Sequence, residues 1–194
     1  AEAEIEYAEL RSPSIYVKFP VKDAKGLFAI EDAYVVIWTT TPWTLPANVA
    51  ISIHPEFEYQ LVQFEADKYL VAKEMLKNVI SECGLPETYQ VLGQWKGKEL
   101  DGVLCRHPFL DRDSVVINGE HVTLEAGSGC VHTAPGHGMD DFIVSQKYGL
   151  PVISPLDDQG HLTSEAGRFA GISSDYANIE ICQWLDEFGY LLNL

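Results

Sequence analysis

The stretch Ala33-Tyr-Val-Val-Ile-Trp38 continues directly into Thr39-Thr-Thr-Pro-Trp-Thr-Leu-Pro-Ala-Asn48. Its first six residues are apolar or aromatic, and a short run of this kind is typical of a strand buried on both faces. In the second half, Pro42 and Pro46 exclude a central strand and the interior of a helix. The sequence therefore predicts a buried strand that ends in a stiff bend carrying several threonine hydroxyls.

Short segments rich in β-branched and aromatic residues recur along the whole chain, with turn residues between them. The expected strands are residues 14–21, 33–38, 49–53, 58–64, 68–72, 89–92 and 114–117. Helical periodicity, each time followed by a glycine, predicts helices over residues 73–83, 140–148 and 175–188. Many short strands with few helices predict a β-rich α+β fold, with a barrel-like β body and about three peripheral helices.

Composition limits the possible functions. The chain has 194 residues with 13 Lys and Arg against 29 Asp and Glu, a net charge of −16, which excludes a broad nucleic-acid grip and a polybasic membrane binder. No apolar run approaches the roughly 20 residues of a membrane span. The four cysteines form no CxxC pair, and no secretory signal is recognised, so we expect reduced, mostly buried thiols and a cytoplasmic location.

The length predicts a single domain over residues 1–194. Residues 1–10 carry four glutamates and no turn signal. We interpret residues 1–10 and 190–194 as remnants of linkers to a longer protein.

The threonine bend is the first candidate for a functional site. The hydroxyls of Thr39, Thr40, Thr41 and Thr44 could line a pocket that binds oxygen atoms or positions a water, and Asn48 adds a donor and an acceptor. The alternative is that these hydroxyls only satisfy their own loop. No nucleophile motif is present, which favours hydrolysis by a positioned water over an acyl-enzyme.

The second candidate is the glycine-rich stretch 125–141, Glu-Ala-Gly-Ser-Gly-Cys-Val-His-Thr-Ala-Pro-Gly-His-Gly-Met-Asp-Asp. It concentrates His132, His137, Asp140 and Asp141 within ten residues, just before an expected helix. A purely structural interpretation makes Asp140 the N-cap and lets Asp141 complement the helix dipole. A metal interpretation uses His132, His137 and Asp141 as ligands, although their spacing is not HExxH.

The remaining histidines are isolated in the sequence, and we expect them at the surface or in ordinary polar networks. They are His54, His107, His121 and His161.

Together, the threonine block and the glycine-rich block resemble the two signature blocks of the editing domain of isoleucyl-tRNA synthetase, the connective-peptide insertion of a class I aminoacyl-tRNA synthetase. The resemblance spans nearly the whole chain, and Thr41-Pro42-Trp43 points to the isoleucyl member because its valyl and leucyl relatives carry an Arg-Pro version. The HIGH and KMSKS motifs are absent, so we expect no aminoacylation. The resemblance implies hydrolysis of valine esterified to isoleucine tRNA, and of valyl-adenylate as a second substrate.

The resemblance also implies roles for individual residues. The carboxylate of Asp141 should receive the α-ammonium of the substrate, and the hydroxyls of Thr39–Thr41, Thr40 foremost, should hold the ester and the attacking water. His132 should line the pocket for the amino-acid side chain or the terminal ribose. The catalytic candidates are Thr39, Thr40, Thr41 and Asp141, and the substrate-binding candidates are Trp43, Asn48, His132 and Asp141, whereas His137 has no assigned role.

The implied partners are the 3′ end of the mischarged tRNA and the remainder of the synthetase, with no metal, cofactor or membrane. Lys18, Arg106 and Lys147 could guide the end of the tRNA. Because the chain is so acidic, the domain alone should bind tRNA weakly. Two alternatives remain, a metal-dependent hydrolase of a small ester and a non-catalytic amino-acid-binding module.

Overall fold

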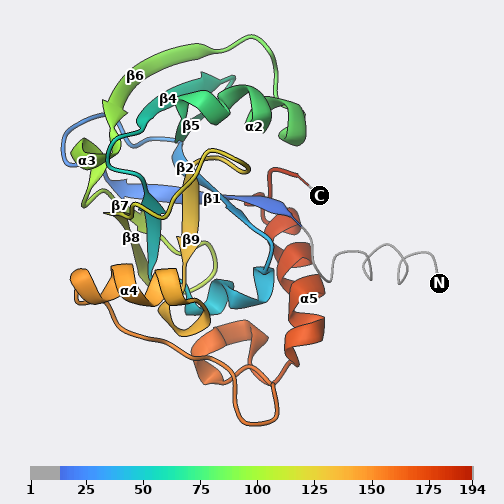
Figure 1. Ribbon diagram of the computed structural model, residues 1–194. Helices are drawn as coiled ribbons and strands as arrows, with labels where there is room; N and C mark the ends of the chain where they lie inside the picture. Colours follow the sequence, from blue (N-terminus) through green and yellow to red (C-terminus); the bar gives the residue numbers. More distant parts are fainter. Residues whose placement is uncertain (1–13, 194) are drawn as a thin grey trace.

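Six strands close into a barrel in the computed structural model, which describes residues 14–193 (Figure 1). Around the ring lie β1 (Ile15–Asp23), β7 (Leu104–Arg106), β8 (Asp113–Asn118), β3 (Ala50–Ile53), β9 (Cys130–Thr133) and β2 (Ala33–Thr39). Antiparallel pairing of β2 with β1 closes the ring. The barrel-like β body expected from the sequence is therefore confirmed.

Three further strands extend from the barrel, because β2 has two neighbours on the same side. Residues 33–35 of β2 pair with β5 (Asp67–Ala72), whereas Trp38 pairs with Val131 of β9. Beyond β5 lie β4 (Glu58–Phe64) and the edge strand β6 (Gln90–Lys96). All seven expected strands are present, and the sequence interpretation missed the two short strands β7 and β9.

The core follows the alternation of side chains along the strands. In β1 and β2, Val17, Phe19, Val35 and Ile37 pack into the largest apolar cluster. Their neighbours of opposite parity face a second cluster beneath helix α2, in which Val36 packs with residues of that helix. Both faces of β2 are thus covered, as the apolar run predicts.

The three expected helices are confirmed as α2 (Leu76–Cys83), α4 (Met139–Lys147) and α5 (Ser174–Glu187). Gly84 ends α2 in the left-handed conformation, with φ 62°. The structure adds a short helix, α3, and four 3₁₀ helices: α3 (Gly97–Leu100), η2 (Pro42–Ala47), η3 (Lys73–Met75), η4 (Pro135–His137) and η5 (Ser164–Phe169). The first turn of the helix expected from residue 73 is therefore the 3₁₀ helix η3.

Two local expectations are corrected. The N-cap of α4 is Gly138, not Asp140, and no side chain caps this end. The bend after β2 is the 3₁₀ helix η2, with Pro46 inside it. This helix is held by its neighbours, since the Arg112 guanidinium donates to the Pro46 and Asn48 carbonyls at 2.6 and 2.9 Å.

The chain after α5 returns to the barrel. The Leu192 N–H donates to the Tyr16 carbonyl at 2.9 Å, and the Asn193 side chain accepts from the Tyr16 N–H at 2.8 Å. Residues 1–10 lie outside the described part of the chain, and the linker interpretation of both ends stays a prediction.

The four cysteines are unpaired, and Cys105, Cys130 and Cys182 are buried. Burial raises the pKa of the Cys130 and Cys182 thiols to about 12, so they are inert apolar groups. Within residues 14–193 no helix combines the length and apolar character that crossing a membrane requires.

Candidate active site

A cavity of about 430 Å³ opens where β2, β9 and the start of α4 meet. It brings together the two sequence blocks, since Thr39–Thr41 lie on one side and Ala134, His137 and Asp141 on the other. The lining residues are Trp38, Thr39, Thr40, Thr41, Thr44, His121, Val122, Thr123, Glu125, Ala126, Val131, His132, Ala134, His137 and Asp141. Of the predicted site residues, only Trp43 and Asn48 are outside this lining.

His132 is held by hydrogen bonds at both ring nitrogens. The Asn48 amide group donates to Nδ1 at 2.7 Å, and Nε2 lies 2.8 Å from the Thr44 hydroxyl. Because Thr44 donates its own proton to the Thr41 carbonyl at 2.8 Å, Nε2 must carry the proton and donate to Thr44. His132 is therefore a neutral imidazole with no free nitrogen.

Burial is the main cause that lowers the pKa of His132 to about 3, and the charge of His137 acts in the same direction. The residue is 7% exposed and lines the cavity, and because both ring nitrogens are hydrogen-bonded it presents ring carbon atoms there. His132 forms a fixed wall and is not available as a general base near neutral pH.

Asn48 lies behind His132. It is fully buried, donates to the Ala50 carbonyl at 3.0 Å and accepts from the Ser114 hydroxyl at 2.6 Å. With its bond to His132, its side chain is saturated by protein groups. The geometry makes Asn48 a positioning residue for His132, and the expectation that it contacts substrate stays a prediction.

The threonines divide between the two interpretations made from the sequence. The Thr39 hydroxyl accepts from the Thr41 N–H at 3.1 Å, and Thr44 bonds within the loop, as the structural alternative expected. Thr40 differs, because its side chain is exposed and lines the cavity. Its hydroxyl has no hydrogen-bond partner among residues 14–193, and it is therefore available to a ligand.

Asp141 stands in the first turn of α4, with one oxygen used and one free. Oδ2 accepts from the Ala134 N–H at 3.0 Å, whereas Oδ1 has no partner in the described chain. Burial raises the pKa of this carboxyl, and the hydrogen bond from the Ala134 N–H is the largest effect that counteracts that shift. The free oxygen suits a cationic group.

Trp43 packs beside the cavity rather than in its wall. Its backbone N–H donates to the Asn178 side chain at 2.9 Å, and its ring meets the His137 ring edge-on at a centroid distance of 4.9 Å. Burial lowers the pKa of His137, which does line the cavity. Direct contact of Trp43 with substrate stays a prediction.

The metal interpretation of His132, His137 and Asp141 finds little support in this geometry. Both nitrogens of His132 are occupied by protein hydrogen bonds. Within residues 14–193 no group of three or more His, Cys, Asp or Glu side chains is arranged to hold an ion.

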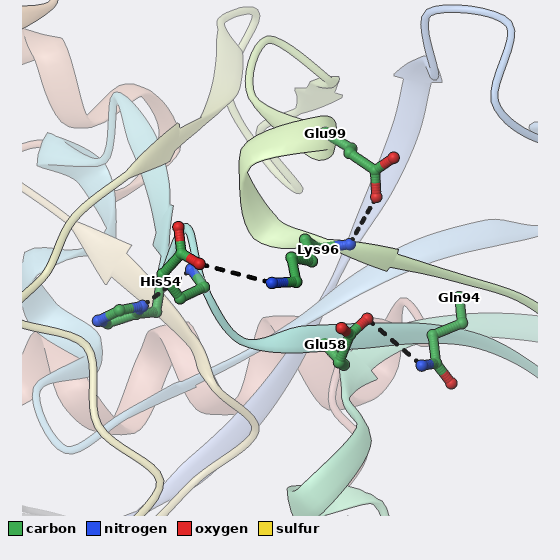
Figure 2. A network of polar contacts seen from close by, with 6 residues as sticks. His54, Glu58, Gln94, Lys96 and Glu99 are labelled. Carbon is green, nitrogen blue, oxygen red and sulfur yellow. Dashed lines mark hydrogen bonds and ion pairs between the residues drawn. The ribbon is translucent and has the colours of Figure 1, made fainter.

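Three of the four isolated histidines lie in ordinary polar networks, as expected. His107 is buried, and its Nε2 donates to the Leu45 carbonyl at 2.7 Å. His161 lies beside Asp157. His54 accepts from the Glu56 N–H in an exposed network, in which Glu56 forms an ion pair of 3.5 Å with Lys96. Gln94 of β6 donates to Glu58 of β4 at 3.3 Å, and the Lys96 N–H donates to Glu99 of α3 at 2.8 Å (Figure 2).

The expectation for His121 was wrong. This residue follows β8 and lines the cavity with Asp141, together with Glu125 from the start of the glycine-rich block. Its sequence neighbourhood holds no unusual motif. The one usable signal is that Asn118-Gly119 ends a strand and turns the next residues in a new direction.

Comparison with known proteins agrees with the fold. Residues 11–183 match the family described as "Leucyl-tRNA synthetase, editing domain". Isoleucine–tRNA ligase of Moorella thermoacetica is 58% identical over 193 residues, and that of Geobacillus thermodenitrificans 57% over 194. Each match covers 100% of this chain and 21% of the relative, so the chain spans about a fifth of the length of these curated relatives.

Solved structures show the same fold at low sequence identity. A crystal structure described as GlLeuRS-CP1 has a TM-score of 0.70 at 14% identity, covering 92% of this chain and 97% of that one. The editing domain of the cytosolic leucyl-tRNA synthetase of P. knowlesi has a TM-score of 0.68 at 12% identity, with coverages of 92% and 94%. On these grounds the chain belongs to the editing-domain family of the leucyl- and isoleucyl-tRNA synthetases.

Proposed function

We propose that this chain is a hydrolytic editing site that deacylates valyl-tRNA(Ile), with valyl-adenylate as a second substrate. The observation that carries the proposal is the cavity itself: the Thr40 hydroxyl and one oxygen of Asp141, neither with a partner within residues 14–193, line the same space. An aminoacyl ester has an oxygen-rich reacting centre beside a cationic amine. The Thr40 hydroxyl suits the oxygen atoms of the ester, and the Asp141 carboxylate suits the amine.

Asp141 receives the α-ammonium of the aminoacyl group. A carboxylate is the natural partner of that cation, and a charge-assisted hydrogen bond is stronger than a neutral one. The Ala134 N–H holds the other oxygen and so fixes the direction of the carboxylate. The amino acid is thereby anchored at its α-carbon.

Thr39, Thr40 and Thr41 position the ester and the attacking water. Their contribution is orientation and stabilisation of the charge that develops on the ester oxygen. Water is the nucleophile in this proposal, without metal, cofactor or covalent intermediate. His132 takes no proton, because Asn48 and Thr44 occupy both of its nitrogens.

His132 supplies a rigid side of the pocket for the amino-acid side chain. One methylene is worth only about 1–3 kcal/mol of discrimination, and isoleucyl-tRNA synthetase is itself the standard example of this limit. A second pocket that admits valine and rejects isoleucine by size supplies the remaining fidelity. Discrimination by size requires a rigid pocket wall. The hydrogen bonds from Asn48 and Thr44 hold the His132 ring in place and so support that requirement.

The partners in this proposal are the 3′ end of the mischarged tRNA and the remainder of a synthetase in the cytoplasm. The net charge of −16 opposes tight binding of tRNA by this chain alone. We therefore expect the activity of the isolated chain to require a high protein concentration. Aminoacylation, in this proposal, is an activity of the full-length synthetase and not of this chain.

The test is deacylation of valyl- and isoleucyl-tRNA(Ile) by the isolated chain, in the presence of EDTA. The valyl ester should be hydrolysed and the isoleucyl ester spared, and Thr40→Val should lower the valyl rate at least tenfold. Equal survival of both esters at high protein concentration rejects the editing function. Loss of activity in EDTA supports the metal-dependent alternative, and saturable binding without turnover supports a binding module.

A further inference from the structure

His121 is held over the cavity by a tight turn. β8 ends at Asn118, the Gly119 N–H donates to the Ile53 carbonyl at 2.8 Å, and the Val122 N–H donates to the Gly119 carbonyl at 3.4 Å. The ring lies against Gly119, where an added Cβ would be 2.6 Å from the ring Cε1 of His121. The backbone therefore sets the place of this ring.

The Nε2 atom of His121 is buried and has no hydrogen-bond partner within residues 14–193. Burial of a polar atom without a partner is unfavourable, and most buried polar groups are paired. His121 lines the same cavity as Asp141, whose Oδ1 also has no partner within residues 14–193. Two vacant acceptor positions thus share one cavity.

A primary ammonium group fits these two positions. It carries three N–H donors and no acceptor, so it can donate both to a carboxylate oxygen and to a neutral imidazole nitrogen. No lysine or arginine is present in the described lining of the cavity to take either position. His132 offers no comparable site, because its nitrogens are saturated.

We propose that His121 is a specificity-determining residue that accepts a hydrogen bond from the α-ammonium of the substrate at Nε2, together with Asp141. The inference rests on the proposed function and adds a second receptor for the same group. With two receptors, the site distinguishes an ester with a free α-amine from one whose amine is absent. Asp141 supplies the charge and His121 the direction.

The experiment compares two non-hydrolysable probes by calorimetry. One is 3′-(L-valylamino)-3′-deoxyadenosine, and the other is its 3-methylbutanoyl counterpart, which lacks only the amine. The wild-type chain should favour the amine-bearing probe. His121→Ala should weaken that probe about tenfold, or about 1.4 kcal/mol, and should leave the amine-free probe unchanged.

Further variants separate binding from a structural role. His121→Gln places an amide oxygen near the position of Nε2 and should recover part of the affinity, whereas Gly119→Ala should displace the ring and reproduce the selective loss. His161→Ala is the matched control, because His161 lies outside the cavity, and it should bind both probes as the wild-type chain does.

The inference is overturned if His121→Ala weakens both probes equally, weakens neither, or if the wild-type chain does not favour the amine. These readouts need no turnover. A chain that favours the amine through His121 but hydrolyses no ester would contradict the proposed function and uphold the inference. A chain that hydrolyses valyl-tRNA with unaltered amine selectivity in His121→Ala would do the reverse.

Discussion

The two walls of the cavity differ in how their polar atoms are used. In the saturated wall, formed by Thr44, His132, Asn48 and Ser114, hydrogen bonds run from the Ser114 hydroxyl to the Thr41 carbonyl. In the open wall, formed by Thr40, Asp141, His121 and His137, each side chain keeps a polar atom without a partner in the described chain. The same space thus has a rigid side and a receptive side.

This difference separates residues that shape the site from residues that bind. A saturated network holds its members in one rotamer and one tautomer, which favours discrimination by size. An unpartnered atom keeps its hydrogen-bonding capacity for a ligand. Burial without a partner is not sufficient by itself, since Ser145 and Trp184 also have such atoms, but neither lines the cavity.

The largest effect is expected when the open wall loses the negative charge of Asp141. Asp141→Asn keeps an oxygen for the Ala134 N–H and removes the charge that receives the ammonium. Loss of one partner of a buried charge pair costs about 2–5 kcal/mol, so kcat/KM for valyl-tRNA should fall about 30- to 5,000-fold. Stability should change little by comparison.

The matched control is Asp140→Asn, at the neighbouring exposed position of the same helical turn. Its kcat/KM should stay within about threefold of the wild-type value, because half a kcal/mol or so is usual for a surface change. Deacylation at the wild-type rate by Asp141→Asn would remove Asp141 from the site.

A substitution in the saturated wall should lower the free energy of unfolding. Asn48→Ala removes the hydrogen bonds of Asn48 to His132 Nδ1, the Ser114 hydroxyl and the Ala50 carbonyl in a buried place. The free energy of unfolding should fall by about 2–3 kcal/mol, which urea titration measures. Thr40→Ala is the comparison, since its exposed hydroxyl has no partner in residues 14–193, and its unfolding free energy should change by less than about 0.5 kcal/mol. Equal losses of unfolding free energy in Asn48→Ala and Thr40→Ala would contradict the distinction between a saturated and an open wall.

The pH dependence of stability tests, with a smaller expected effect, whether His132 of the saturated wall is neutral in the folded chain. Burial lowers the pKa of His132 to about 3 in the folded chain, against 6.5 for an unperturbed histidine. Between these values the unfolded state binds a proton that the folded state does not. Stability therefore falls as the pH falls from about 6.5 towards 3, by about 1.4 kcal/mol per pH unit for this residue.

His132→Gln should reduce that slope by about the same amount, measured as urea-derived unfolding free energy between pH 4.5 and 6. His107, whose pKa burial also lowers to about 3, should keep its own contribution in the variant. Identical slopes for the wild-type chain and His132→Gln would show that His132 is protonated in the fold.

Much of the fold followed from local patterns, and the misses have a common cause. The apolar run 33–38 forms a buried strand, because apolar side chains on both of its faces must be covered. β9 was missed because its four residues lie between glycines and carry no alternation of their own. It is a strand because β3 and β2 offer it partners on both sides.

The candidate site divides in the same way. Asp141 and the threonines were identified because unusual residues crowd next to a strand end and a helix start. His121 was missed because it lies in an ordinary turn, and its proximity to Asp141 exists only in the folded chain.

By itself, the sequence determined seven of the nine strands in residues 14–193, the three main helices, the family and the two blocks that meet at the cavity. Only the tertiary structure decided which polar atoms are satisfied. Asn48 and Thr44 reach His132 across 84 and 88 residues of sequence. Hydrogen-bond saturation depends on such distant partners, whereas strand and helix patterns depend on near neighbours. For that reason residue composition revealed the site, and the fold separated its supports from its receptors.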